Sequence, residues 1–68
     1  MKKEITINIL RDEVVIKEED GSEQMVPLGN PDWKSLTRDE IIHFVKNKLE
    51  GSVYISGDIE DYNTDVVQ

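Results

Sequence analysis

Apolar and polar residues alternate over the first part of the chain, at the spacing of half-buried β-strands. Ile5, Ile7 and Ile9 take every second position, with Thr6 and Asn8 between them. β-branched residues of this kind pack well on a pleated surface. The pattern therefore predicts a strand that turns its isoleucines towards a core.

Turn signals divide residues 4–28 into three strands. The charged triplet RDE predicts a turn, and the stretch VVIK then resumes the alternation. The dipeptide Asp20-Gly21 is a strong hairpin signal, because glycine tolerates positive φ. In the third stretch, QMVPL, Pro27 lacks an N–H, so we expect it at the strand's end or on a sheet edge. The segments predict an antiparallel meander; the alternative is one long hairpin with RDE as a bulge.

The clearest signal in the sequence is a helix over residues 38–50. Thr37 and Glu40 have the spacing of a capping box, in which each side chain accepts a hydrogen bond from the other residue's N–H. Gly51 is a suitable C-terminal stop. Apolar residues recur at helical spacing on one broad face, which comprises Ile41, Ile42, Phe44, Val45 and Leu49. We therefore expect one amphipathic helix that packs across the sheet.

After the helix, the stretch SVYISGDI (residues 52–59) predicts one more strand, with Gly57 at a bulge or at the strand's end. Residues 58–68 are rich in carboxylates and predict an acidic C-terminal tail, whose order the sequence leaves open. The elements then follow the order βββαβ in a single α+β domain over residues 1–57. Its expected architecture is a small antiparallel sheet, of three N-terminal strands and one C-terminal strand, with one α-helix on a face.

The small size of the chain raises the question of what stabilises it. It has 68 residues and no cysteine, so disulfides and thiolate metal sites are excluded. A single core of this size supplies only about 3–5 kcal/mol of net stability. Association with a second copy through an exposed strand edge would add to it. A homodimer is therefore one hypothesis from the sequence.

The net charge of −7, from fifteen acidic and eight basic residues, narrows the choice of partners. Such a surface repels phosphate backbones and anionic lipids, so we expect neither direct nucleic-acid binding nor membrane binding. The opening MKKEITINIL lacks the apolar core of a signal peptide, and no apolar run approaches the roughly 20 residues that span a bilayer. We expect a cytoplasmic protein whose partner is a protein with basic charge.

The carboxylates are concentrated in two runs. From Asp12 to Glu23 there are six acids and one base, and from Glu50 to Asp65 there are five acids and no base. If the last strand pairs next to the first hairpin, the two runs form one negative ridge that attracts a basic partner. The predicted partner-binding residues are Glu18, Glu19, Asp20, Asp58, Glu60, Asp61 and Asp65.

The sequence predicts no metal, no cofactor and no catalytic site. Asp61, Asn63 and Asp65 match the opening of a calcium loop, but the glycine and the terminal glutamate that complete such a loop are missing. His43 is the only histidine, and we expect it on the solvated face of the helix. The paired carboxylates fall in predicted turns, whereas acid–base catalysis needs a cleft that separates their pKa values. We therefore expect the chain not to be an enzyme.

Trp33 lies in the loop before the helix and is either part of the core or an exposed hot spot for a partner. The leading hypothesis for function is a small, acidic, non-enzymatic protein-interaction or accessory module. The alternative is an inhibitor that mimics nucleic acid and occupies the basic groove of a DNA- or RNA-processing protein.

Overall fold

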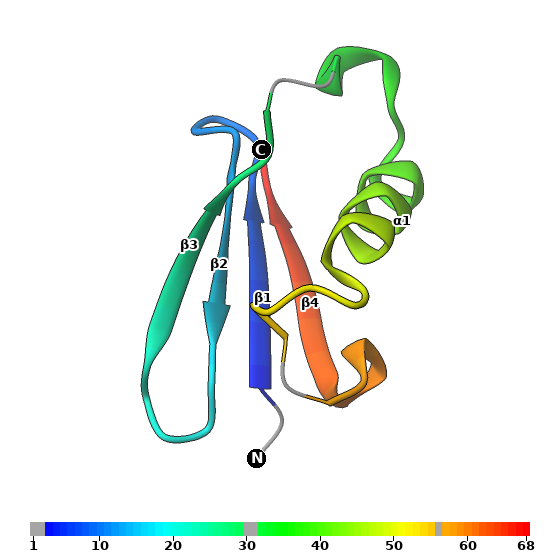
Figure 1. Cartoon of the computed structure of the whole chain (residues 1–68). Helices are drawn as coiled ribbons and strands as arrows, with labels where there is room; N and C mark the ends of the chain where they lie inside the picture. The colour runs from blue at the N-terminus through cyan, green and yellow to red at the C-terminus, as the bar shows by residue number, and fades with distance from the viewer. Residues whose placement is uncertain (1–2, 30–31, 56) are drawn as a thin grey trace.

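The computed structural model describes residues 3–29, 32–55 and 57–68. None of the helices in these ranges has the length and apolar character that a membrane crossing requires. The α+β class and the order βββαβ predicted from the sequence are confirmed (Figure 1). With η for a short 3-10 helix, the elements are β1 (Lys3–Asn8), β2 (Glu13–Lys17), β3 (Glu23–Pro27), η1 (Trp33–Ser35), α1 (Arg38–Leu49), η2 (Ile59–Asp61) and β4 (Tyr62–Val67).

The four strands form one mixed sheet in the order β3-β2-β1-β4. β1 and β3 are both antiparallel to β2, with Ile7 opposite Val14 and Val14 opposite Val26, whereas β4 is parallel to β1, with Ile5 opposite Thr64. The sequence predicted antiparallel pairing throughout. The pairing differs because α1 carries the chain back to the end of the sheet where β3 began. β4 therefore runs in the same direction as β3 and β1.

The core lies between one face of the sheet and one face of α1. Ile5 and Ile7 are both buried there, as their alternation with polar residues predicted. Removal of apolar surface from water, at about 25 cal/mol per Å², is the main term that holds these layers together. The residues of this core, at most 7% exposed, are Ile5, Ile7, Val14, Ile16, Val26, Leu28, Ile41, Val45, Leu49, Ile59 and Tyr62.

A turn joins β1 to β2, so the chain forms the meander and not the single long hairpin. The Arg11 N–H donates to Asn8 Oδ1 over 3.1 Å, and the Asp12 N–H donates to the Ile9 carbonyl over 3.3 Å. Asp12 has a φ of 54°, a region that aspartate enters more readily than most residues. The predicted turn is confirmed, but it begins at Ile9, which the alternation had placed in the first strand.

The helix α1 has the predicted start and the predicted cap. Thr37 Oγ1 accepts from the Glu40 N–H over 3.2 Å, and Glu40 Oε1 accepts from the Thr37 N–H over 2.9 Å. The hydrogen bond from the Thr37 backbone stabilises the carboxylate and so lowers the pKa of Glu40. The helix ends at Leu49, one residue before the predicted end, and Gly51 follows with a φ of 75°. Phe44, expected on the buried face, is 38% exposed.

The last strand lies later in the chain than the sequence predicted. Residues 52–55 form a turn and a loop, and Ser56, also within the predicted strand at 52–59, lies outside the described residues. The strand prediction there is wrong. β4 forms instead within residues 58–68, the predicted acidic tail, because this segment can pair with β1 along its whole length.

Candidate functional site

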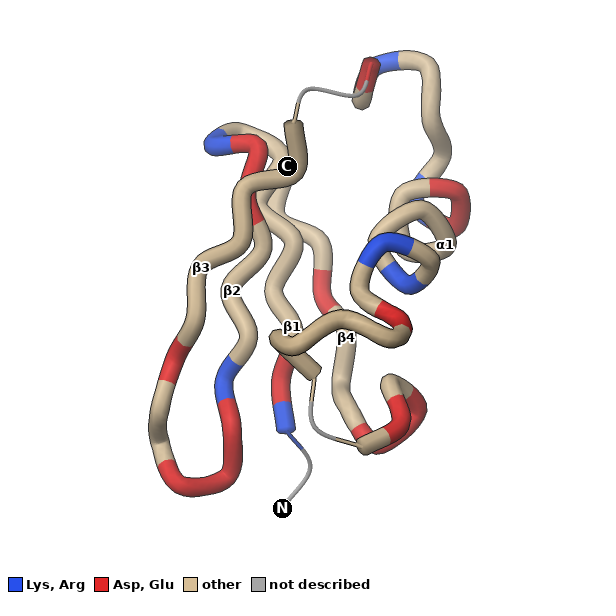
Figure 2. Tube along the Cα trace, viewed as in Figure 1, with Lys and Arg blue, Asp and Glu red and all other residues tan. Residues whose placement is uncertain are grey.

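Parts of the two acidic runs of the sequence gather at one end of the sheet. Lys3, the first residue of β1, pairs with Tyr62, the first residue of β4, and Glu4 pairs with Lys17 at the end of β2. The β2–β3 hairpin extends beyond this end and η2 lies beside it, as Figure 2 shows. We call this region the acidic end, and the carboxylates that the two runs contribute to it are Glu18, Glu19, Asp20, Glu23, Asp58, Glu60 and Asp61.

The acidic end contains six of the seven carboxylates that the sequence predicted as a partner-binding surface. The seventh, Asp65, lies beyond the middle of β4 and opposite Thr6 in β1. Its Oδ1 is 3.8 Å from Arg38 Nη2 and accepts from the Val66 N–H over 3.0 Å. Asp65 therefore belongs to the edge of β4 and not to the acidic end.

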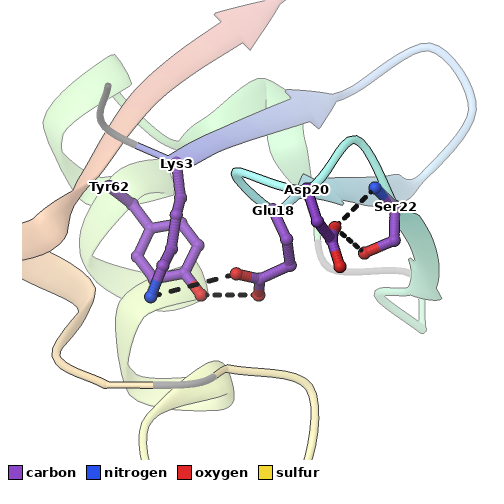
Figure 3. Close-up of polar contacts among 5 residues, drawn as sticks. All are labelled: Lys3, Glu18, Asp20, Ser22 and Tyr62. Carbon is purple, nitrogen blue, oxygen red and sulfur yellow. Dashed lines mark hydrogen bonds and ion pairs between the residues drawn. The ribbon is translucent and has the colours of Figure 1, made fainter.

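Glu18 connects the hairpin to the first residues of β1 and β4 (Figure 3). The Tyr62 hydroxyl donates to Glu18 Oε1 over 2.9 Å, and Lys3 Nζ lies 3.9 Å from Glu18 Oε2. Lys3 Nζ is also 5.2 Å from the centroid of the Tyr62 ring, a cation–π contact worth about 0.5–1 kcal/mol where exposed. Glu18 was predicted to bind a partner, but its carboxylate already has two partners within the chain.

The tip of the hairpin is shaped by Asp20 and Ser22 (Figure 3). Asp20 Oδ1 accepts from the Ser22 hydroxyl over 2.6 Å and from the Ser22 N–H over 2.8 Å. The hydroxyl bond and then the N–H bond lower the pKa of Asp20, because both favour the carboxylate. Gly21, with a φ of 92°, completes the turn that Asp20-Gly21 predicted.

Lys3 lies between the two acidic runs. Glu18, in the hairpin, is its ion-pair partner on one side. On the other side is Gly57, next to η2: a Cβ placed on this glycine would be 3.7 Å from Lys3 Nζ and 3.7 Å from Asp61 Oδ2. The Lys3 ammonium group therefore pairs with a carboxylate of the first run and lies near the segment that carries those of the second, so it offsets part of their mutual repulsion.

An open hollow lies beside the hairpin, with a volume of about 560 Å³. One side is acidic, and the other is apolar and aromatic, from the loop that follows α1. In this loop Val53 is 92% exposed and Tyr54 is 38% exposed. Figure 1 shows the loop crossing in front of β1 towards the hairpin end. The hollow is lined by Lys3, Ile16, Glu18, Glu19, Asp20, Ser22, Glu23, Gln24, Val53 and Tyr54.

The hollow has the chemistry of a site for a cationic side chain. Lysine and arginine carry a charged head on an aliphatic stem, and the stem packs on apolar or aromatic surface while the head remains near carboxylates and water. Val53 and Tyr54 offer such a surface for the stem, and Glu19 and Glu23 offer charge for the head. An arginine guanidinium would also stack on the Tyr54 ring.

The residues that resemble a calcium loop adopt a different conformation. Asp61 ends η2, while Asn63 and Asp65 occupy alternate positions of the extended strand β4. A calcium loop instead wraps its ligands around the ion in a tight turn. Within residues 3–29, 32–55 and 57–68, no group of three or more His, Cys, Asp or Glu side chains is placed to hold a metal ion.

Trp33, the predicted core residue or hot spot, is half-buried and packs against the core. Its indole Nε1–H donates to Asp12 Oδ1 over 2.9 Å, and its ring meets Phe44 edge-on at 5.8 Å between centroids. Asp12 lies in the β1–β2 turn, at the other end of the sheet from the hairpin. The structure therefore does not bring Trp33 together with the acidic end.

Comparisons of the chain with protein-family models, with curated proteins and with solved structures gave no match.

Sequence reasoning missed four residues of the site: Lys3, Val53, Tyr54 and Tyr62. Tyr62 and Glu18 are 44 positions apart, so their hydrogen bond depends on the pairing of β4 with β1. Val53 and Tyr54 had been placed in a strand, where one of them would face the core. The helix-ending glycine and serine, Gly51 and Ser52, directly before this hydrophobic pair were the available signal for a loop.

Proposed function

We propose that this chain is a small, acidic, non-enzymatic interaction module that binds a basic segment of a partner protein at its acidic end. The observation that carries the proposal is a hollow lined both by carboxylates of the β2–β3 hairpin and by the exposed Val53 and Tyr54. Charge alone serves solubility on many surfaces. Charge next to exposed Val53 and Tyr54 is what a binding surface for lysine or arginine needs.

The exposure of the carboxylates supports binding in preference to catalysis. Glu19, Asp20, Glu23, Asp58 and Glu60 are all exposed. Acid–base catalysis relies on burial to separate the pKa values of two carboxyls. Exposed carboxylates instead increase the rate at which a basic partner associates, and their effect weakens as salt is added.

A second candidate, mimicry of nucleic acid, is favoured by the gathering of carboxylates from both runs at the acidic end. Such an inhibitor would occupy the basic groove of a DNA- or RNA-processing protein. A phosphate backbone presents a regular series of negative charges. Lys3 places a positive charge between the two runs, which suits a binding surface for separate basic side chains better than an imitation of a backbone.

The test is a titration of the ¹⁵N-labelled protein with a short peptide of alternating arginine and serine. We expect saturable amide shifts at residues 18–23, 52–55 and 57–61 that weaken steeply with added NaCl. In the variant Glu19→Lys with Glu23→Lys, the affinity for the peptide should fall about tenfold. This is the loss of binding free energy expected when a few solvent-exposed ion pairs are removed. Glu18 is left unchanged because of its bond to Tyr62.

The matched control is Glu13→Lys with Asp32→Lys. It changes the net charge by the same amount, but Glu13 pairs with Asn8 and Pro27 at the other end of the sheet, and Asp32 precedes η1. Peptide shifts spread evenly over the surface, or an equal loss of affinity in both double variants, would show only a general charge effect and would contradict the proposal.

A further inference from the structure

The outer edge of β3 presents main-chain groups to solvent in a definite pattern. The Leu28 N–H donates to the Asp12 carbonyl, and the Glu18 N–H donates to the Ser22 carbonyl, both over 2.9 Å. Hydrogen-bonded and non-hydrogen-bonded pairs alternate along an antiparallel ladder. Between these two bonds, the hydrogen-bonded pairs of the β2–β3 register are therefore Ile16 with Gln24 and Val14 with Val26.

The other three residues of β3 must turn their main-chain groups away from β2. Glu23 and Met25 present both an N–H and a carbonyl at the edge, and Pro27 presents only a carbonyl. Pro27 therefore stands where its missing N–H costs no bond within the sheet, as expected for proline on an edge strand. Met25, at the middle of this edge, is 70% exposed.

The edge of β4 is better protected. The Asp65 carboxylate accepts from the Val66 N–H, and Arg38 of α1 lies beside the same carboxylate. Figure 1 places α1 on the β4 side of the sheet, away from β3. Local hydrogen bonds and charged side chains of this kind prevent an edge from pairing with another strand.

We propose that two copies of the chain associate through their β3 edges, antiparallel, about a two-fold axis at Met25. Residues whose numbers add to 50 then stand opposite each other. Met25 pairs with Met25 of the second copy, and Glu23 pairs with Pro27. The result is a continuous eight-stranded sheet across the two copies.

This register fits the groups that the edge presents. The two Met25 residues exchange both of their main-chain hydrogen bonds, and each Glu23 N–H donates to a Pro27 carbonyl. The absent N–H of Pro27 leaves one Glu23 carbonyl at each end to water. No two like charges face each other, since glutamate stands opposite proline and Gln24 opposite Val26, and like charges directly opposite would be destabilising.

The arrangement also separates the acidic ends. The strands of the pair run in opposite directions, so the hairpin of each copy lies beyond the Pro27 end of its partner's β3. Repulsion between two chains of charge −7 still opposes association. The dimer should therefore strengthen as salt screens this repulsion, whereas binding of a basic peptide at the acidic end should weaken. Because salt affects the two associations in opposite directions, the dimer and the proposed peptide binding can be tested separately.

The experiment is sedimentation equilibrium up to about 1 mM protein, the range of weak association, at low salt and in about 0.5 M NaCl. We expect a monomer–dimer equilibrium that shifts towards the dimer at high salt. Hydrogen exchange of the Glu23 and Met25 amides should slow as the protein concentration rises. The edge is short, so a weak dimer is expected.

Two variants test the register. Met25→Lys places two ammonium groups across the axis and should weaken the dimer at least tenfold. Asn63→Lys is its matched control, because it adds the same charge at an exposed position of β4. Met25→Pro removes the outward N–H and should abolish the dimer, with the circular dichroism spectrum showing whether the monomer stays folded.

Two results would overturn the inference. A monomer at every concentration and salt would exclude the dimer. A dimer that Asn63→Lys disrupts and Met25→Lys leaves unchanged would place the contact on β4.

Discussion

At the scale of single residues, the cap of α1 shows how much a short motif can determine. Thr37 and Glu40 were predicted to cap each other, and the structure contains both hydrogen bonds. All the groups involved lie within four consecutive residues, so no tertiary contact is needed to predict them. The same two residues allow a prediction about pH.

Protonation of Glu40 should destabilise the protein. The pKa of Glu40 is lowered in the folded state by the Thr37 hydrogen bonds. The contribution of its carboxylate to the free energy of unfolding is therefore fully present above the ordinary glutamate pKa of about 4.3. This contribution is lost as the pH falls through the lower pKa that Glu40 has in the folded state. Glu40→Gln should therefore make stability less dependent on pH in this acid range, and Thr37→Ala should cost about 1 kcal/mol at neutral pH.

Urea unfolding, followed by circular dichroism at a series of acid pH values, measures this dependence. Glu50→Gln is the control, since it makes the same chemical change at the C-terminal end of the helix. If the free energy of unfolding depends on acid pH identically in the wild type and in Glu40→Gln, the charge of Glu40 contributes nothing to stability through the capping box.

Glu18 shows the limit of residue-level prediction. The sequence placed it in an acidic run, and the structure confirms that it lies in the hairpin after β2. Its bond to Tyr62 depends on β4, which joins β1 from the other end of the chain. The composition of a run can therefore predict where charge gathers, but not which carboxylate is already engaged inside the fold.

At the scale of elements, the sequence predicts those whose pattern is local. The isoleucine alternation, the Asp20-Gly21 turn and the capped helix each appear in the structure. The position of the last strand could not be predicted in this way. Val53 and Ile55 offered the more hydrophobic alternation, but β4 formed where Tyr62, Thr64 and Val66 alternate with polar residues. Pairing with the central strand β1 outweighed local hydrophobicity.

Deleting residues 62–68 should unfold the protein. The deletion removes β4, turns β1 into an edge strand and takes Tyr62, which is 5% exposed, out of the core. Burial of a large side chain is worth about 1.5–3 kcal/mol, against about 3–5 kcal/mol of net stability for a core of this size. The amide spectrum of the truncated chain should lose its dispersion.

Removal of Gln68 alone is the control, because β4 ends at Val67. A dispersed spectrum for the long truncation would show that the remaining strands fold without β4. That outcome would restore the view that residues 58–68 are a tail outside the folded domain.

At the scale of the whole molecule, the charge is distributed unevenly. Seven carboxylates of the two acidic runs, far apart in the sequence, gather at one end of the sheet because the β2–β3 hairpin extends beyond that end and η2 lies beside it. The sequence predicted that the runs would merge if the last strand paired beside the first hairpin. The last strand does pair beside β1 of the first hairpin, but residues 62–67 form it in place of residues 52–59, and it brings η2 next to Lys3.

This concentration of like charge should reduce stability, since repulsion within one end of a molecule opposes its compact state. Glu19→Gln with Glu60→Gln removes one charge from each run at exposed positions. We expect the double variant to be more stable than the wild type by up to about 0.5 kcal/mol at low ionic strength. The gain should disappear in about 1 M NaCl, where the screening length falls to about 3 Å. The same variant should bind the arginine–serine peptide more weakly.

A gain in stability together with a loss of binding would indicate that the acidic end is maintained for a partner at a cost to the fold, as is common at functional sites. Thermal unfolding at the two salt concentrations, with the peptide titration alongside, measures both quantities. Glu13→Gln with Asp32→Gln is the control, because it removes the same number of negative charges away from the acidic end. If this control gains as much stability and loses as much affinity, only the total charge matters. The acidic end would then be ordinary solvated surface.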